Sequence, residues 1–206
     1  MHVYVQVIKD YYEELWERLP EQLALPDLER RLAFLLAEVS PGDRVLDVGF
    51  GDGTFTAELA RVGARVVGVE VAEAALKRAH AAHPELDFRL GPVGGPLPLG
   101  DGAFDVVWAS EVIEHVADTA RWLSELRRVM SPGGRLLLTT PNHPRAFLLV
   151  RGIERYSNPL SDHLHLYTRH SLHGLLNEFG FEPVQVRTAG GPPLFRRLLL
   201  ARAVRS

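Results

Sequence analysis

Cysteine is absent from this sequence of 206 residues. Its absence excludes disulfide bonds, thiolate metal ligands and a cysteine nucleophile. Lysine is scarce as well, because only Lys9 and Lys77 accompany the many arginines. Positive charge is not in excess either: the formal net charge of −3 at pH 7 gives no general attraction for nucleic acid.

Long apolar runs are also missing. No run approaches the roughly 20 residues that cross a bilayer as a helix. The N-terminal residues lack a basic region followed by an apolar stretch, so we predict no secretory signal and expect a cytoplasmic protein. Hydrophobic residues make up 46% and charged residues 24% of the chain, which is typical of globular proteins. The length suits one α/β domain rather than two.

The most informative stretch is residues 44–54, Arg-Val-Leu-Asp-Val-Gly-Phe-Gly-Asp-Gly-Thr. Its apolar start predicts a buried parallel strand, which gives way to glycines at alternate positions, Gly49, Gly51 and Gly53. A helix is predicted from Thr54 onward. A strand, a glycine turn and a helix are how an α/β domain presents backbone N–H groups to a polar ligand.

A second strand end carries an acidic side chain. Glu70 closes the apolar run 66–70, close to the spacing expected for a carboxylate that binds a ribose. The dinucleotide fingerprint is Gly-x-Gly-x-x-Gly, and here the third glycine comes one residue early. This spacing disfavours a nicotinamide-dependent oxidoreductase. The alternative to a ligand-binding turn is a glycine turn that only packs a helix on a strand.

Strands and helices alternate along the rest of the chain, which predicts a doubly wound, mainly parallel sheet with ligands at the carboxyl ends of its strands. The last two strands are close in sequence and should pair antiparallel. The predicted strands are 45–48, 65–70, 86–90, 104–109, 135–140, 181–188 and 198–204, with a turn at 132–134, and the predicted helices are 54–62, 72–83, 119–130 and 168–179.

Two further segments flank this pattern. Residues 1–40 are expected to hold two N-terminal helices, of which the first, over 7–19, could cover the ligand site or simply pack on the sheet. Residues 142–167 lose regularity and carry His143 and His163. A loop this long inside a compact domain is usually functional, so we predict a substrate lid there.

The pattern Asp-x-Gly-x-Gly-x-Gly, followed by a strand ending in Glu, resembles the class I methyltransferases that use S-adenosylmethionine (SAM). Segments 101–107, 110–116, 131–142 and 162–169 extend the resemblance over about residues 25–205, toward the small-molecule group that includes the ubiquinone-pathway O-methyltransferases. The resemblance implies a single methyltransferase domain over residues 1–206. It also implies a Rossmann-like sheet of seven strands, mainly parallel, with the last strand inserted antiparallel.

The resemblance also implies a cofactor site. In the family the glycine turn receives the methionine part of SAM, and the acidic residue, here Glu70, holds both ribose hydroxyls. Many relatives have an Asp after the third strand, near the adenine amino group, whereas this chain has Gly-Pro-Val-Gly-Gly, so no side chain is assigned to adenine. The implied cofactor-binding residues are Asp47, Gly49, Phe50, Gly51, Gly53, Glu70, Val71, Val93 and Ser110.

Methyl transfer from a sulfonium is an in-line displacement that needs alignment and exclusion of water. Transfer to a hydroxyl gains from a base that removes its proton. His143 follows the fifth strand, and His115 with Glu114 follows the fourth, so these are the candidate catalytic residues.

The segment Ser110-Glu-Val-Ile-Glu-His also offers metal ligands. Glu111, Glu114 and His115 are expected to share one face of a first helical turn, where they could hold Mg²⁺, Mn²⁺ or Zn²⁺. Glu-x-x-Glu-His resembles the metal-binding segment of ubiquinone-pathway O-methyltransferases and of small-RNA 3′-end methyltransferases. The latter add a later histidine, matched here by His163. The alternative is that no metal binds. In that case Glu111 and Glu114 help to order the cofactor helix, and His115 is a packing or positioning residue.

The sequence therefore predicts a SAM-dependent methyltransferase that acts on a small molecule, at oxygen. A SAM-binding protein without transferase activity and a small-RNA 2′-O-methyltransferase remain as alternatives. The negative net charge of the chain counts against the small-RNA methyltransferase. The acceptor and the oligomeric state are left open.

Overall fold

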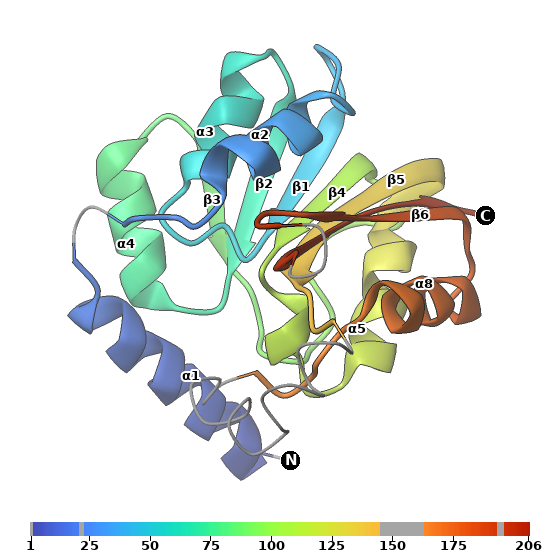
Figure 1. The fold of residues 1–206 in the computed structure, drawn as a ribbon. Helices are drawn as coiled ribbons and strands as arrows, with labels where there is room; N and C mark the ends of the chain where they lie inside the picture. The colour runs from blue at the N-terminus through green and yellow to red at the C-terminus, as the bar shows by residue number, and fades with distance from the viewer. Residues whose placement is uncertain (1, 21–22, 145–162, 193–195) are drawn as a thin grey trace.

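The computed structural model describes residues 2–20, 23–144, 163–192 and 196–206 (Figure 1). Within these ranges the strands form one seven-stranded sheet in the order β3-β2-β1-β4-β5-β7-β6. Strands β1 to β5 pair in parallel, and β7 lies antiparallel between β5 and β6, as predicted. The strands are β1 (Arg44–Val48), β2 (Arg65–Glu70), β3 (Asp87–Leu90), β4 (Phe104–Ser110), β5 (Met130–Pro141), β6 (Phe181–Ala189) and β7 (Leu198–Arg205).

The helices after β1 lie close to the predicted ranges, whereas α1 begins at His2 and not at residue 7. They are α1 (His2–Arg18), α2 (Leu28–Leu36), α3 (Thr54–Arg61), α4 (Glu73–Ala82), the short 3₁₀ helix η1 (Ile113–His115), α5 (Thr119–Val129) and α8 (Arg169–Glu178). The Thr168 side chain caps α8, because its hydroxyl accepts a hydrogen bond from Ser171 N–H. None of the helices described is both long and apolar enough to cross a membrane.

The central strands bury side chains on both faces. Along β4, Val106 and Trp108 pack with Leu35 of α2, whereas the alternate residues Val107 and Ala109 pack with the cluster under α5 and α8. Adjacent residues of a strand point to opposite faces, which explains the near-continuous apolar runs in the sequence. Figure 1 shows α1 outside these layers, beside α4.

One predicted turn is instead part of a strand. The sequence predicted a turn at residues 132–134, but β5 begins at Met130 and runs through it. The pairing of β5 with β4 shifts register there, between Phe104 and Val106. Gly133 has a positive φ of 75°, and a Cβ on Gly134 would come within 2.8 Å of Ser131 O. The glycines therefore make an irregular strand start rather than a chain reversal.

Most of the predicted lid, residues 145–162, lies outside the described residues, so the lid stays a prediction. Its two ends are described. Asn142 pairs with Tyr167 in an isolated parallel bridge, and His143 N–H donates to Tyr167 O at 2.9 Å. The chain therefore leaves and re-enters the described structure at neighbouring points beside the end of β5.

A carboxyl group is buried in β1. Asp47 is 1% exposed, and its Oδ2 accepts a hydrogen bond from Thr56 Oγ1 of α3 at 2.7 Å. Burial raises the pKa of Asp47 to about 7, although the Thr56 hydrogen bond opposes the shift. Asp47 thus ties α3 to β1 directly beneath the glycine turn.

This buried carboxyl should make stability depend on pH. Because the folded pKa of about 7 lies above the unfolded value of about 3.9, Asp47 contributes stability at low pH that is lost as pH rises through about 7. We therefore expect the Asp47→Asn variant to gain in free energy of unfolding, relative to the parent, as pH rises from about 4 to about 7. Urea denaturation of both proteins across this range measures the difference. A difference that stays constant with pH would contradict the assignment.

Candidate cofactor and acceptor site

The turn after β1 is built from glycines that no other residue could replace without strain. Gly49, Gly51 and Gly53 have positive φ angles of 71°, 61° and 85°. A Cβ on Gly49 would lie 2.6 Å from Val112 Cγ2, and one on Gly53 would lie 2.9 Å from Phe88 Cζ. The turn therefore needs glycine both for its backbone conformation and for its close packing on Val112 and Phe88.

Glu70 ends β2 beside this turn. Its side chain accepts hydrogen bonds from Val71 N–H at 2.7 Å and from Gly51 N–H at 3.3 Å. Burial raises the pKa of Glu70, and these backbone hydrogen bonds oppose the shift. A bare glycine turn next to a carboxylate fits a ligand that has a ribose, and we call residues 49–53 with Glu70 the cofactor cradle.

The other predicted cofactor residues take different places. The Phe50 ring points away from the cradle and packs on Phe88, with ring centroids 4.6 Å apart. Asp47 lies beneath the turn, as described above. Val71 supplies a backbone N–H to Glu70, and Val93 is half-buried after β3. The Phe50 ring thus anchors the turn to the core, and Asp47 ties the turn to α3.

The acidic residues after β4 divide between two sides of the sheet. Thr139 Oγ1 donates to Glu111 Oε1 at 2.8 Å, whereas Thr140 Oγ1 donates to Glu114 Oε2 at 2.9 Å. Adjacent threonines of a strand point to opposite faces, so the two carboxylates are held apart. The prediction that Glu111 and Glu114 share a helical face is wrong, because Glu111 has a φ of 56° and η1 begins only at Ile113.

Glu111 belongs to a cluster that the sequence did not reveal. Arg31 of α2 is 4% exposed and donates to Ser110 Oγ at 2.9 Å, and Ser110 Oγ lies 2.8 Å from Thr139 Oγ1. Burial raises the pKa of Glu111, and the charge of Arg31 opposes this shift. An arginine three residues after Leu28 and four before Leu35, on the apolar stripe of the helix, was the available signal.

Glu114 instead meets two histidines. One ligand atom each from Glu114, His115 and His163 lies within 4.8 Å of the others, and Glu111 is not in this group. Leu164 N–H and His165 N–H both donate to Glu114 O, at 2.8 and 3.1 Å, which brings His163 to His115. The two imidazole rings are 4.7 Å apart. We call these three residues the Glu114 cluster, and its oxygen and nitrogen donors fit a divalent ion.

His143 is buried near this cluster. Its side chain is 3% exposed, and burial, aided by the charge of His163, lowers the pKa of His143 to about 4. The imidazole is therefore neutral at pH 7, with a ring nitrogen that can accept a proton. Trp108, by contrast, is fully buried against Phe34 and Phe55, as expected of a core residue.

Comparison with known proteins supports one interpretation of this geometry. A family described as a methyltransferase domain matches residues 15–186. A probable SAM-dependent methyltransferase of Mycolicibacterium smegmatis is 41% identical over 107 residues, which cover 52% of this chain and 41% of that protein. A ubiquinone biosynthesis O-methyltransferase of Xanthomonas campestris is 36% identical over 144 residues, covering 66% of this chain and 60% of that protein.

The chain thus matches about 40–60% of the length of these two relatives. The crystal structure of a SAM-dependent methyltransferase from Mesorhizobium loti superposes with a TM-score of 0.70 at 20% identity, over 88% of this chain and 99% of that one. The structural comparison shows that this chain has the fold of such an enzyme, in agreement with the family match of its sequence. The chain therefore belongs to the class I methyltransferases that use S-adenosylmethionine.

Proposed function

We propose that this chain transfers the methyl group of SAM to an oxygen of a small-molecule acceptor. The observation that carries the proposal is that the cofactor cradle and the Glu114 cluster lie at the carboxyl ends of adjoining parallel strands, β1, β2 and β4. Ligands of open α/β sheets bind at such an edge. The similarity to an O-methyltransferase of ubiquinone biosynthesis favours oxygen as the methylated atom.

On the cofactor side, the residues of the chain bind SAM and orient it. The Glu70 carboxylate is already held by two backbone N–H groups, so it can accept hydrogen bonds from two ribose hydroxyls without rearranging. Gly49 and Gly51 give the turn its positive φ angles, and the methionine part of SAM would lie along this turn. SAM supplies an activated methyl group on a sulfonium, and alignment of the acceptor with that methyl is the main task of the protein.

On the acceptor side the chain supplies bases. His143 is neutral at pH 7 and can take the proton of an acceptor hydroxyl at a ring nitrogen. His115 is the second candidate, since its ring lies beside the acceptor side of the site with Nε2 3.9 Å from Glu114 Oε1. In the alternative arrangement Glu114, His115 and His163 would hold a divalent ion, which would lower the pKa of a hydroxyl bound to it, and His143 would remain as the base.

The cofactor assignment predicts a selective loss of binding. We expect Glu70→Ala to weaken binding of S-adenosylhomocysteine by about 1.5–3 kcal/mol, because two charge-assisted hydrogen bonds to the ribose disappear. Isothermal titration calorimetry measures the change. Glu85→Ala, which alters an exposed carboxylate in the turn before β3, is the matched control and should bind like the parent. Equal affinity of the Glu70 variant and the parent would place the cofactor elsewhere.

The metal assignment predicts a difference between two nearby acids. We expect the parent to bind Mn²⁺ or Zn²⁺, and both Glu114→Gln and His163→Ala to bind it at least about tenfold more weakly, as loss of a ligand or its support commonly does. Glu111→Gln is the matched control, because Glu111 pairs with Thr139 outside the cluster. Calorimetric titration of the metal-free chain provides the measurement. If the parent binds no metal, or if Glu111→Gln loses as much affinity as Glu114→Gln, the proposed metal site is wrong.

A further inference from the structure

One side of α1 contacts the cofactor cradle. Trp16 lies over the glycine turn, where its ring would be 3.2 Å from a Cβ on Gly51. One turn earlier on the same side, the Tyr12 ring meets the His115 ring edge-on, with centroids 6.2 Å apart. A single helix therefore contacts both the cradle and the Glu114 cluster.

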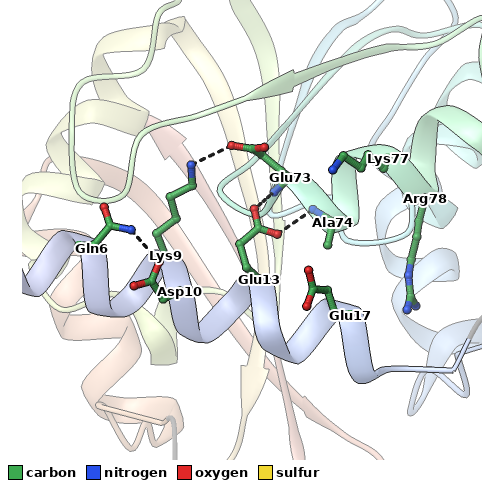
Figure 2. A pocket seen from close by; sticks show the side chains of 9 residues that line it. All are labelled: Gln6, Lys9, Asp10, Glu13, Glu17, Glu73, Ala74, Lys77 and Arg78. Atoms are coloured by element: carbon green, nitrogen blue, oxygen red, sulfur yellow. Dashed lines mark hydrogen bonds and ion pairs between the residues drawn. The ribbon is translucent and has the colours of Figure 1, made fainter.

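Glu13, between these aromatic residues, caps another helix. Its two carboxylate oxygens accept hydrogen bonds from Glu73 N–H at 2.6 Å and Ala74 N–H at 2.8 Å, at the first turn of α4 (Figure 2). The N-cap residue of α4 itself is Ala72, which offers no side-chain cap. A carboxylate from α1 thus satisfies two N–H groups that α4 leaves unpaired, and its charge suits the helix N-terminus.

The position of this cap connects it to cofactor binding. Helix α4 begins at Glu73, three residues after Glu70, whose carboxylate belongs to the cradle. The Glu13 hydrogen bonds therefore hold α1 at the point where the chain leaves the cradle. Arg78 of α4 adds to this attachment, since its guanidinium donates to Leu19 O at 2.6 Å and lies 5.8 Å from the centre of the Trp16 ring.

A polar groove separates much of α1 from α4. A groove of about 500 Å³ runs between the two helices, and eight of its nine lining residues are polar (Figure 2). The ion pair between Lys9 and Glu73 at 2.9 Å is exposed, and such pairs contribute little. The attachments of α1 to α4 are therefore mainly hydrogen bonds at the edge of this groove, chiefly those of Glu13, and α1 can be released when they break.

We propose that α1 is a releasable roof over the bound cofactor, with Trp16 as its contact with the cofactor and Glu13 as its latch on α4. This rests on the cofactor site proposed above. The roof must lift before the cofactor can leave, so the strength of the latch sets the rate of release. Because Tyr12 contacts His115, the closed roof also completes the acceptor side of the site.

The test is the dissociation rate of S-adenosylhomocysteine, measured by stopped-flow displacement. We expect Glu13→Gln to raise this rate about threefold to tenfold, in line with the loss of a helix cap. Trp16→Leu, which keeps the latch but removes the indole, should also raise the rate. Glu17→Gln is the matched control, since Glu17 lines the same groove one turn later and makes no hydrogen bond to α4 among the described residues.

A double variant separates the roof from a general loss of stability. If Glu13 and Trp16 act in one opening event, the two substitutions together should raise the rate by less than the product of their single effects. Multiplicative effects, or rates equal to those of the parent and Glu17→Gln, would overturn the proposal. Failure of the parent to bind S-adenosylhomocysteine at all would instead refute the cofactor site. Thermal unfolding without ligand shows whether each variant is folded.

Discussion

The backbone pairing of the five parallel strands, β1 to β5, fixes where the loops that form the site begin. The pairing continues one residue beyond β1, β3 and β4: Gly49 N–H donates to Val69 O at 2.8 Å, Gly91 N–H to Glu70 O at 2.7 Å and Glu111 N–H to Thr139 O at 2.9 Å. The loops after β1, β3 and β4 therefore start from fixed positions along one edge of the sheet. The cradle and the Glu114 cluster are neighbours because the strands that precede them, β1 and β4, are adjacent in the sheet.

The pleat of β5 then divides the polar groups at this edge. Thr139 directs Glu111 toward Arg31 and Ser110, and Thr140 directs Glu114 toward the histidines. Burying two carboxylates side by side would raise the cost of ionising either one, and their separation avoids this. One side of the sheet therefore holds the buried Arg31 cation near the Glu111 carboxyl group. The other side brings Glu114 together with imidazoles suited to proton transfer or metal binding.

Local patterns were sufficient to predict the strands, their order of appearance and the cradle, because glycine at positive φ and an acid at a strand end leave short-range signals. The separation of Glu111 from Glu114 could not be predicted, since it depends on the backbone of Glu111 and on hydroxyl partners from another strand. Arg31 was missed because its partners, Ser110 and Thr139, are distant in sequence. The position of α1 was left between two alternatives, because Glu13 caps a helix some 60 residues away.

The central claim is that cofactor and acceptor meet between the cradle and the Glu114 cluster. A crystal structure of the chain with S-adenosylhomocysteine tests it most directly. The account predicts both ribose hydroxyls on Glu70, the homocysteine part along the glycine turn, and the sulfur facing His115 and His143. A ligand bound elsewhere, or a sulfur that faces the Arg31 side of the sheet, would contradict it.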